Sequence, residues 1–526
     1  MAVAGIDLGT TFSAIAYLDG EGRPKILENR EGDRTTPSAV NFDENGTPLV
    51  GVMAKQLSVE QPGNTVQYVK RSIGDKNWHF LTDSGEQYSA EAISALILKR
   101  LKDDAESLLG EPLQGVVITV PAYFDDAQRK ATHDAGSIAG LNVLKIINEP
   151  TAAALAYGCC GGGGDEVVAV YDLGGGTFDV TVMKVGGEAI EVLATGGDRN
   201  LGGFDWDNAL MVFLSEEFKR QTGLDLLADT DTGEAFLRDK AENAKKALTL
   251  RESTTLSLTF DGKRGKIELD RRMFAGLTES LLKRTLDIMR MTLEEAAKVP
   301  EEEDVSLADL IGRLGISKIL LVGGSTRMVM VREALEKETG LTPSIELNPD
   351  EVVALGAALQ AGISLAKSSG EKKSRKMGLP DKLLNMRIQD VNSHGLGVVA
   401  LKGDGDEEYN AIVMPKNTAI PSAVSEVFYT AIDNQTGLMV QVTEGDDEDL
   451  SMVRIIGEAA MSIAPHPKGS PVEVAFQYDE SGIVHVRVKD KLTGKDLGEV
   501  VIQRTSNLDE EEVRMLKARI GEVRVD

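Results

Sequence analysis

Two glycine-rich segments of the sequence have residue types that suit phosphate binding. Residues 5–11 read Gly-Ile-Asp-Leu-Gly-Thr-Thr, residues 172–179 read Asp-Leu-Gly-Gly-Gly-Thr-Phe-Asp, and each lies between apolar β-type runs. Glycines let main-chain N–H groups approach phosphate oxygens, threonines add hydroxyl donors, and paired aspartates hold hydrated Mg²⁺. An ordinary glycine hairpin would explain one such segment. Two matching hairpins favour a duplicated nucleotide-binding unit, with Asp7 and Asp172 as the Mg²⁺ pair.

A third glycine-rich segment, at 321–327, follows a β-type run and precedes a helical pattern. Gly323 and Gly324 would allow close packing against a nucleoside, although a plain strand-to-helix turn uses glycine in the same way. Asp350 stands at the start of a further helical pattern that is rich in small residues. We expect it to cap that helix first and to contact a nucleoside second.

The elements that must position these segments follow from the apolar pattern. Residues 3–365 alternate short β-type runs with helical patterns, which predicts α/β layering. We expect an amphipathic helix over 91–109 that ends at Gly110. The expected strands lie at 15–18, 116–120, 167–171 and 319–322.

The remainder of the chain has a different pattern. A basic run without apolar periodicity follows residue 367 and predicts a flexible linker. Short β-type runs between turn residues then predict an all-β sandwich, and an acidic segment near the end predicts a helix of a few turns. The expected organisation is therefore a nucleotide-binding domain over 1–366, a linker over 367–387, a β-sandwich domain over 388–505 and a short helical segment over 506–526.

Composition limits the classes of function. The chain has 526 residues, and at about 100–200 residues per domain this predicts three or four units. The formal net charge of −27 argues against binding to nucleic acid or to anionic membranes. Cys159 and Cys160 are neighbours, which argues against an ordinary structural disulfide and for a reducing compartment. No apolar run approaches the ~18 residues of a membrane helix, and the N-terminus lacks a basic signal region, so we expect a cytoplasmic protein.

The motifs together resemble one family. With Val-Pro-Ala-Tyr-Phe at 120–124 and Ile-Asn-Glu-Pro-Thr-Ala-Ala-Ala at 147–154, the three glycine-rich segments are similar to those of the seventy-kilodalton heat-shock chaperones of the bacterial DnaK type. The resemblance implies an α/β actin-like ATPase domain with duplicated ribonuclease-H-like halves, followed by an all-β sandwich peptide-binding domain. It implies an ATP-dependent chaperone that binds extended apolar segments of unfolded polypeptides, with a J-domain co-chaperone and a nucleotide-exchange factor as partners.

The resemblance also implies roles for residues of the ATPase domain. Hydrolysis, with Mg²⁺ and K⁺ as cofactors, would involve Lys70, Glu149, Asp172, Thr177 and Asp179. Lys70 would stabilise charge on the γ-phosphate, and Asp7 and Asp172 would hold Mg²⁺ through water. ATP or ADP would be bound by Thr10, Thr11, Gly174, Gly175, Gly176, Glu242, Lys245, Lys246, Gly323, Gly324, Ser325, Arg327 and Asp350. The three lysines of these sets would equally suit a solvated surface.

Further roles concern the β domain and its connection. The peptide cleft would be formed by Val398, Leu401, Phe428, Ala431, Leu438 and Val440, although the same six residues would also suit the core of a sandwich. One apolar side chain buried in such a cleft contributes about 1.5–3 kcal/mol, which predicts weak and sequence-tolerant binding. Pro121 and Arg129 would belong to a relay between the domains.

The sequence departs from the family pattern at several places. Lys246 stands where the family usually has an arginine against the adenine, which predicts weaker nucleotide binding. At the family's apolar linker the chain has Lys-Leu-Leu-Asn-Met-Arg at 382–387, which predicts altered linker docking. Lys145 and Lys468 replace arginines for co-chaperone contact and lid latching. Residues 508–525 can supply only the beginning of the family's helical lid, which predicts an open cleft.

Two alternatives share the actin-like scaffold. A small-molecule kinase would use the same two hairpins, but it would leave the all-β module without a role. A filament-forming or purely regulatory nucleotide switch, with weak chaperone coupling, is compatible with every motif described above.

Overall fold

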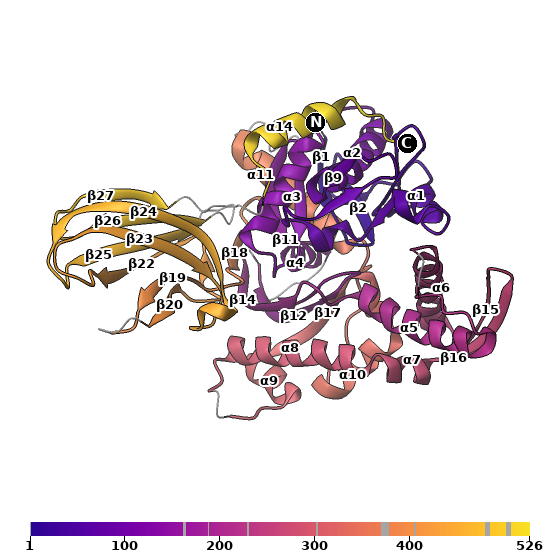
Figure 1. Cartoon of the computed structure of the whole chain (residues 1–526). Coiled ribbons are helices and arrows are strands. Elements are labelled where there is room, and N and C mark those ends of the chain that lie inside the picture. The colour runs from indigo at the N-terminus through magenta and orange to yellow at the C-terminus, as the bar shows by residue number, and fades with distance from the viewer. Residues whose placement is uncertain are drawn as a thin grey trace.

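The computed structural model describes residues 2–160, 165–187, 189–228, 231–300, 303–369, 378–403, 407–478, 484–500 and 507–526. Figure 1 shows an α/β part on one side and a β domain on the other, with the last helix of the chain lying back on the α/β part. Among the described residues, no helix has the length and apolar character needed to span a membrane.

The first sheet of the α/β part carries the first glycine hairpin. Its strand order is β11-β10-β1-β2-β3, in which β1, β2 and β3 are antiparallel and β10 and β11 run parallel to β1. The strands are β1 (Ala2–Asp7), β2 (Phe12–Leu18), β3 (Pro24–Ile26), β10 (Leu113–Val120) and β11 (Val143–Asn148). The short strand β4 (Thr36–Pro37) pairs with β2. The predicted strands at 15–18 and 116–120 are confirmed.

The second sheet carries the second hairpin and repeats the arrangement of the first. Three antiparallel strands, β12, β13 and β14, are joined by β17, which runs parallel to β12. Two strands from beyond the α/β part extend the sheet, in the order β17-β12-β13-β14-β18-β21. The bounds are β12 (Glu166–Leu173), β13 (Phe178–Val185), β14 (Ala189–Asp198), β17 (Ile316–Val322), β18 (Arg387–Val391) and β21 (Ala419–Ile420). The predicted strands at 167–171 and 319–322 are confirmed.

Two apolar helices fill the space between the sheets. α4 (Glu149–Cys160) and α11 (Val352–Ser369) pack on each other, and one core cluster joins them to residues of both sheets, such as Val117 and Val170. The packing depends on glycine. A Cβ on Gly356 of α11 would lie 1.8 Å from the carbonyl oxygen of Ala152, and a Cβ on Gly5 of β1 would lie 2.0 Å from the nitrogen of Ala358.

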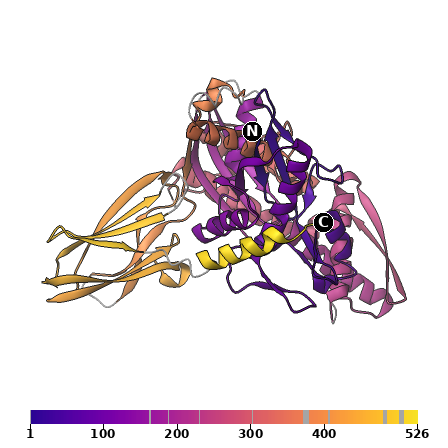
Figure 2. The ribbon, with the colours of Figure 1, turned by 90° about the horizontal axis from the view of Figure 1, so that it is seen from above.

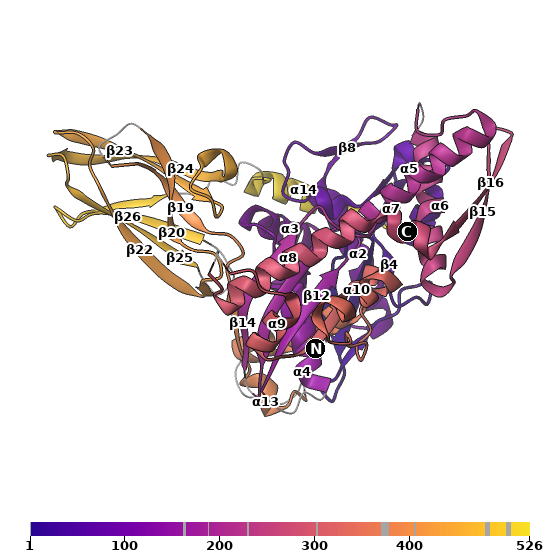
Figure 3. The same cartoon turned by 90° about the horizontal axis from the view of Figure 1, so that it is seen from below.

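Other helices cover the outer faces of the sheets. On the first sheet these are α2 (Ala90–Leu109) and α3 (Asp126–Ile138), and α2 ends at the left-handed Gly110 as predicted. The second sheet is covered by α5 (Gly203–Thr222), α8 (Glu279–Ala297), α9 (Leu307–Leu314) and α10 (Val329–Thr339), while α6 (Asp231–Leu250), β15 (Ser253–Phe260), β16 (Lys263–Asp270) and α7 (Arg271–Leu277) lie at its far end (Figure 3).

A small subdomain sits beside the first sheet. Its sheet has the order β6-β5-β7, which leaves β6 at an edge. The bounds are β5 (Ala39–Phe42), β6 (Pro48–Val50), α1 (Val52–Leu57), β7 (Thr65–Gln67), β8 (His79–Leu81) and β9 (Gln87–Ser89).

The β domain is a sandwich, as predicted. Its sheets have the orders β20-β19-β23-β24 and β22-β25-β26-β27, and one core cluster joins them around residues such as Leu396 and Phe476. The bounds are β19 (Leu396–Leu401), β20 (Glu408–Met414), β22 (Ser422–Tyr429), β23 (Gln435–Glu444), β24 (Arg454–His466), β25 (Pro471–Tyr478), β26 (Val484–Asp490) and β27 (Asp496–Val500).

The structure corrects the flexible linker predicted over 367–387. Residues 370–377 lie outside the described residues, but α11 continues to Ser369 and α13 (Asp381–Leu384) packs on it with Leu383 buried. Strand β18 then pairs in parallel with β14, so the expected domain start at 388 falls inside the α/β sheet. Residues 382–387 take part in this docking through the buried Leu383 and Met386, and β18 continues it through its main chain. Pairing at a strand edge is made by main-chain hydrogen bonds, so it depends little on the side chains of the added strand.

The last segment of the chain folds onto the α/β part. The predicted helix is present as α14 (Glu510–Glu522), which opens with a capping box of Asp509 and Glu512 and packs on α2 and α3 (Figure 2).

We predict that Gly356→Ala destabilises the α/β part by about 1–3 kcal/mol or more, because the new methyl group would overlap the main chain of α4. Gly312→Ala is the matched control, since a Cβ there meets nothing within 4 Å and α9 should be unchanged or slightly stabilised. Denaturant unfolding of both variants checks the prediction. Equal stability of the two variants would contradict the close helix contact.

Candidate functional site

A pocket of about 450 Å³ lies between the halves of the α/β part, where the glycine hairpins face each other. Segments far apart in the sequence line it, including all three glycine-rich segments. Of the residues predicted to bind nucleotide or metal or to take part in hydrolysis, the structure brings these to its wall: Asp7, Thr10, Thr11, Lys70, Glu149, Asp172, Gly174, Gly175, Thr177, Glu242, Lys245, Lys246, Gly323, Gly324, Ser325, Arg327 and Asp350.

The hairpins can approach each other because glycines occupy the contact. A Cβ on Gly175 would lie 1.9 Å from Oγ1 of Thr11, and one on Gly176 would lie 2.6 Å from Cγ2 of Thr10. Gly323 has a φ of 81°, and a Cβ there would lie 2.4 Å from the carbonyl oxygen of Leu173. The three segments thus form one cradle with exposed main-chain groups, which suits the phosphates of a nucleotide.

Buried carboxylates surround one lysine at the bottom of the pocket. Lys70 Nζ lies 2.6 Å from Glu149 Oε1, and both side chains are buried. Burial, with repulsion from Glu149, raises the pKa of Asp7 to about 7 although Lys70 opposes the shift. Burial and the charges of Glu149, Asp179 and Asp7 raise the pKa of Asp172 well above its ordinary value. Burial acts to lower the pKa of Lys70, and the charges of Glu149 and Asp7 outweigh it and raise that pKa.

These carboxylates fit the expected Mg²⁺. The raised pKa values of Asp7 and Asp172 mean that their negative charge is poorly compensated by the protein, and a divalent cation would supply what is missing. Over the described part of the chain, no group of three or more His, Cys, Asp or Glu side chains is arranged to hold a metal ion. A Mg²⁺ at Asp7 and Asp172 would therefore complete its shell with water and phosphate oxygens, as Mg²⁺ in nucleotide sites commonly does.

Two predicted residues lie just behind the wall of the pocket. Asp179 Oδ1 accepts a hydrogen bond of 3.1 Å from the main-chain N–H of Tyr123, while its buried Oδ2 has no partner among the described residues. Burial, with repulsion from Glu149, raises the pKa of Asp179 to about 7. Gly176 lies close against the side chain of Thr10, which lines the pocket.

Charged pairs close the opposite end of the pocket. Glu242 accepts from Lys55 at 2.8 Å and from Lys246 at 2.7 Å, and both ammonium groups lie over the ring of Phe12, at 4.8 and 5.2 Å from its centre. Lys245 donates to Asp207 at 2.7 Å. Because Lys55 and Glu242 come from the two halves, their ion pair joins the halves across the pocket mouth.

Asp350 makes an ion pair that the sequence did not predict. It lies just before α11, which begins at Val352, and its Oδ2 accepts from Arg327 Nη2 at 2.6 Å and from Nε at 3.1 Å. The guanidinium and the carboxylate hold the third glycine segment against the start of α11, and both groups line the pocket.

Sequence reasoning missed several residues of the wall. These are Gly9, Phe12, Thr35, Asp207, Thr249, Leu250, Val322, Met328, Pro349 and Val353, and Lys55 joins them through Glu242. Gly9, Phe12, Val322 and Met328 lie in or beside the glycine-rich segments, so proximity to a motif could have found them. Thr35, Lys55 and Asp207 have no local signal, because only the tertiary fold brings them to the pocket.

The residues predicted for a peptide cleft divide into two groups. Val398 and Val440 are buried in the core of the sandwich, and Phe428 and Leu438 are half-buried against it. Leu401 is 42% exposed, and Ala431 is also exposed.

A cavity of about 640 Å³ lies where the β domain meets the α/β part. Asp390 of β18 is half-buried there and accepts from Asn148 Nδ2 at 2.7 Å and from Thr151 Oγ1 at 3.2 Å. The predicted relay residue Arg129 lines the cavity and donates to Asn148 Oδ1. Pro121, the other predicted relay residue, is buried at the end of β10 and accepts a main-chain hydrogen bond from Phe124, which lines the cavity.

Further polar contacts join the two parts. Arg454 of β24 pairs with Asp125 at 2.9 Å, and Lys416 pairs with Glu295 at 2.9 Å. The ring of His394 packs edge-on against Tyr123 at 4.3 Å, with Nε2 3.3 Å from the Tyr123 carbonyl oxygen. Tyr123 is the residue whose N–H binds Asp179, so a β-domain side chain touches the neighbour of a pocket carboxylate.

The chain is similar to a known protein family over nearly its whole length. The family model described as "Hsp70 protein" matches residues 3–524, which is nearly the whole chain.

We predict that Asp179→Asn flattens the pH dependence of stability of the nucleotide-free protein. The pKa of Asp179 is about 7 in the folded protein and lower in the unfolded chain. The charged carboxylate therefore destabilises the fold at pH 8. The lost stability is regained as the pH falls through 7 toward 4, because the carboxylate becomes protonated in the fold. The free energy of unfolding of the variant should exceed that of the wild type by about 2–4 kcal/mol at pH 8, and this difference should shrink toward pH 5.

Urea unfolding at several pH values measures this difference. Asn keeps the acceptor for the Tyr123 N–H, so the comparison isolates the charge. The matched control is Asp287→Asn on the exposed face of α8, which should leave the pH profile unchanged. A constant gap from pH 5 to pH 8 would contradict the charge repulsion described above.

Proposed function

The chain belongs to the Hsp70 family, and from this premise we propose an ATP-dependent molecular chaperone. Members of the family are ATPases that bind ATP or ADP with Mg²⁺. In this chain, ATP binding and hydrolysis would control the affinity for extended apolar segments of unfolded polypeptides. The family assignment favours this function over a filament protein or a purely regulatory switch.

The α/β part supplies the groups that an ATPase needs. The repeated strand arrangement of its two sheets supports an actin-like domain built from two related halves. The glycine cradle would bind the phosphates, Asp7 and Asp172 would hold Mg²⁺, and K⁺ would add to the charge balance at the same carboxylates. Lys70, oriented by its bond to Glu149, would stabilise charge on the γ-phosphate oxygens. Thr177 at the pocket wall and Asp179 behind it would help to order the attacking water.

The β domain supplies an apolar surface for a peptide. Leu401 and Ala431 are exposed, and Phe428 and Leu438 are half-buried, so their side chains can still gain contacts from a ligand. Val398 and Val440 would form the floor beneath them. An extended peptide that buries one Leu-sized side chain there gains about 1.5–3 kcal/mol, which suits weak binding of varied segments.

One observation carries the proposal that the two activities are coupled. Strand β18 pairs with β14 of the ATPase sheet and with β21 of the β domain, so one sheet crosses both domains. On β18, Asp390 binds Asn148 and Thr151, and these two residues flank Glu149, the partner of Lys70. A displacement of β18 would therefore act on the residue that orients the phosphate-binding lysine.

Partner proteins are proposed by family membership. A J-domain co-chaperone and a nucleotide-exchange factor would assist hydrolysis and exchange. Lys145, which stands in place of a family arginine, lines the interdomain cavity beside Asn148, so a J-domain would meet a point charge there in place of a planar guanidinium.

The proposed function is tested by peptide-stimulated ATPase activity. Slow Mg²⁺-dependent hydrolysis that rises with an unfolded apolar peptide is expected. Asp172→Asn should abolish hydrolysis, because it removes one of the two carboxylates that would hold Mg²⁺. Hydrolysis that ignores peptide, together with the absence of peptide binding in any nucleotide state, would favour the nucleotide switch instead.

We predict that Asp390→Asn uncouples the domains. Asn148 and Thr151 both donate to Asp390 Oδ2, and the Val391 N–H donates to Oδ1, so an amide N–H in place of either oxygen would face a donor. ATP should speed dissociation of a fluorescent apolar peptide by about 5–150-fold in the wild type, and by much less in the variant, while ATP affinity stays within about threefold. Asp381→Asn, exposed on α13, is the matched control. An unchanged ATP effect in Asp390→Asn would show that β18 does not carry the coupling.

A further inference from the structure

The turn that carries Lys70 begins at a residue with an unusual backbone. Lys70 lies in the short 3-10 helix η2 (Val69–Ser72), and Tyr68, which precedes this helix, has a φ of 60°. A tyrosine rarely adopts this left-handed conformation, because its side chain crowds the main chain there. Such a residue keeps its conformation only where the surrounding structure holds it. The contacts of the Tyr68 side chain therefore help to fix the main chain of Lys70.

The contacts that hold Tyr68 come from the other half of the α/β part. Its ring packs edge-on against Phe204, near the start of α5, with 4.8 Å between the ring centres. The guanidinium of Arg238 in α6 lies over both rings, 5.6 Å from the centre of Tyr68 and 4.3 Å from that of Phe204. Arg238 donates to Asn208 of α5 at 2.9 Å and to Glu234 of α6 at 2.8 Å, which fixes it in this place.

Arg71, on the other side of Lys70, contacts the same phenylalanine ring. Its guanidinium lies 4.5 Å from the centre of Phe204 and pairs with the neighbouring Asp205 at 3.3 Å. The side chains of Arg71 and Arg238 are only 17% and 15% exposed, and a cation over an aromatic ring is held more strongly where water is excluded. We call the four side chains of Tyr68, Arg71, Phe204 and Arg238 the Phe204 clamp.

The clamp is joined to the second glycine hairpin. The N–H of Phe204 donates to the carbonyl oxygen of Gly175 at 2.7 Å. A Cβ on Gly176 would lie 3.1 Å from Cγ of Arg71, so the stem of this arginine packs closely on the hairpin. Phe204 therefore has a fixed position relative to the glycine cradle, and through the clamp η2 has one as well.

Lys70 is thus held from two directions. Its Nζ lies 2.6 Å from Glu149, which fixes the end of the side chain. The clamp holds Tyr68 and Arg71, which fix the main chain before and after it. A donor stabilises the charge that develops on a phosphate only at hydrogen-bond distance, and a displacement of about 1 Å can slow a reaction about 100-fold. The position of the main chain at Lys70 should therefore affect catalysis.

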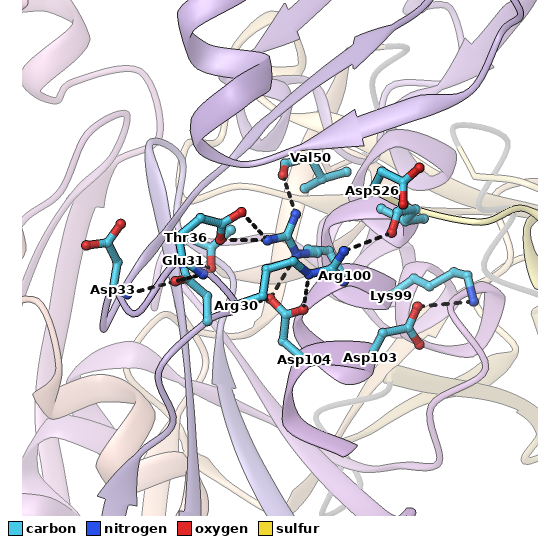
Figure 4. Close-up of polar contacts among 12 residues, drawn as sticks. Arg30, Glu31, Asp33, Thr36, Val50, Lys99, Arg100, Asp103, Asp104 and Asp526 are labelled. Atoms are coloured by element: carbon cyan, nitrogen blue, oxygen red, sulfur yellow. Dashed lines mark hydrogen bonds and ion pairs between the residues drawn. The ribbon is translucent and has the colours of Figure 1, made fainter. Parts of the chain in front are cut away.

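Another loop of the pocket is held without the second half. Thr35 lines the pocket, and the residues before it are bound by the buried Arg100 of α2. Figure 4 shows Arg100 donating to Glu31 at 2.6 Å and to the carbonyl oxygen of Val50 at 2.8 Å, both within the first half. This loop should keep its place when the clamp is weakened, whereas η2 should not.

We propose that Phe204 is a positioning residue for ATP hydrolysis, because the clamp holds the strained turn at Tyr68 and so places Lys70 at the transferred phosphate. In the part of the chain that the structure describes, the pocket wall contains Lys70 and none of the four clamp residues. Loss of the clamp should therefore slow hydrolysis and leave nucleotide affinity nearly unchanged. The inference rests on the ATPase activity proposed above.

Phe204→Leu is the main test variant, because it removes the aromatic ring and keeps an apolar side chain. The matched control is Phe213→Leu, which makes the same change at another half-buried position of α5. Phe204→Tyr keeps the ring and is the conservative variant. The readouts are single-turnover hydrolysis of bound ATP, the affinity for a fluorescent ADP analogue, and hydrogen exchange over 68–72 and 29–36 in the full chain.

We expect hydrolysis to slow about tenfold or more in Phe204→Leu, with ADP affinity within about threefold of the wild type. Exchange should become faster over 68–72 and stay unchanged over 29–36. Phe204→Tyr and Phe213→Leu should hydrolyse ATP within about threefold of the wild-type rate. Hydrolysis at the wild-type rate in Phe204→Leu would overturn the proposal. So would an equal loss of rate in Phe213→Leu or in Phe204→Tyr.

The action through Tyr68 is tested separately with Tyr68→Leu, in which the contact between the two rings is already lost. In this background Phe204→Leu should slow hydrolysis less than it does in the wild type. Strictly additive effects would overturn the route through Tyr68.

Failure of the proposed function gives a different result. If the wild type hydrolyses no ATP, the ATPase proposal fails, and hydrogen exchange decides whether the clamp holds the turn of Lys70. Faster exchange over 68–72 in Phe204→Leu, with 29–36 unchanged, supports the inference. Unchanged exchange over 68–72 overturns it.

Discussion

The uncompensated negative charge between the two glycine hairpins is the constraint on which the rest of the molecule depends. Burial and mutual repulsion raise the pKa values of Asp7 and Asp172, with Lys70 as the opposing charge. Such a cluster is costly to bury, so the surrounding fold must hold it in place. Glycines at the hairpin contact and the close packing of α4 on α11 provide that rigidity. This packing holds the like-charged carboxylates close together, and a bound cation with a polyphosphate would reduce the repulsion between them.

The β domain reaches this cluster through immediate neighbours of its members. Asp390 binds Asn148 and Thr151, one residue before and two residues after Glu149, and His394 packs on Tyr123, whose N–H donates to Asp179. These paths are short and made of hydrogen bonds with defined geometry. A chain of packed side chains across a whole domain is therefore unnecessary for coupling, because the interface lies one residue away from the charged groups.

Some features of the site and of the fold can be predicted from the sequence, and others cannot. The hairpins, the strands beside them and most of the pocket wall could be predicted, because glycine, threonine and aspartate at short spacing have local meaning. Lys55 and Asp207 could not, since their place depends on how distant segments pack. The predicted linker extended too far, because β18 docks through main-chain bonds that leave no pattern in the side chains; most of the basic run itself, at 370–377, lies outside the described residues. The ion pair of Asp350 with Arg327 was not predicted, because the two residues belong to separate segments that only the fold brings together.

Two sets of contacts act on different walls of one pocket, and this separates their effects. Strand β18 and His394 contact the neighbours of Glu149 and Asp179, two carboxylates at the bottom of the pocket. Ser38 holds Gly9 on one wall, and Lys55 of α1 pairs with Glu242 at the mouth. An element can change an equilibrium only through contacts that differ between its states. In the proposed function, contacts at the carboxylates would affect hydrolysis, and contacts at the mouth would affect how long a nucleotide stays bound. The geometry therefore allows the rate of hydrolysis and the lifetime of the bound nucleotide to be set by different parts of the chain.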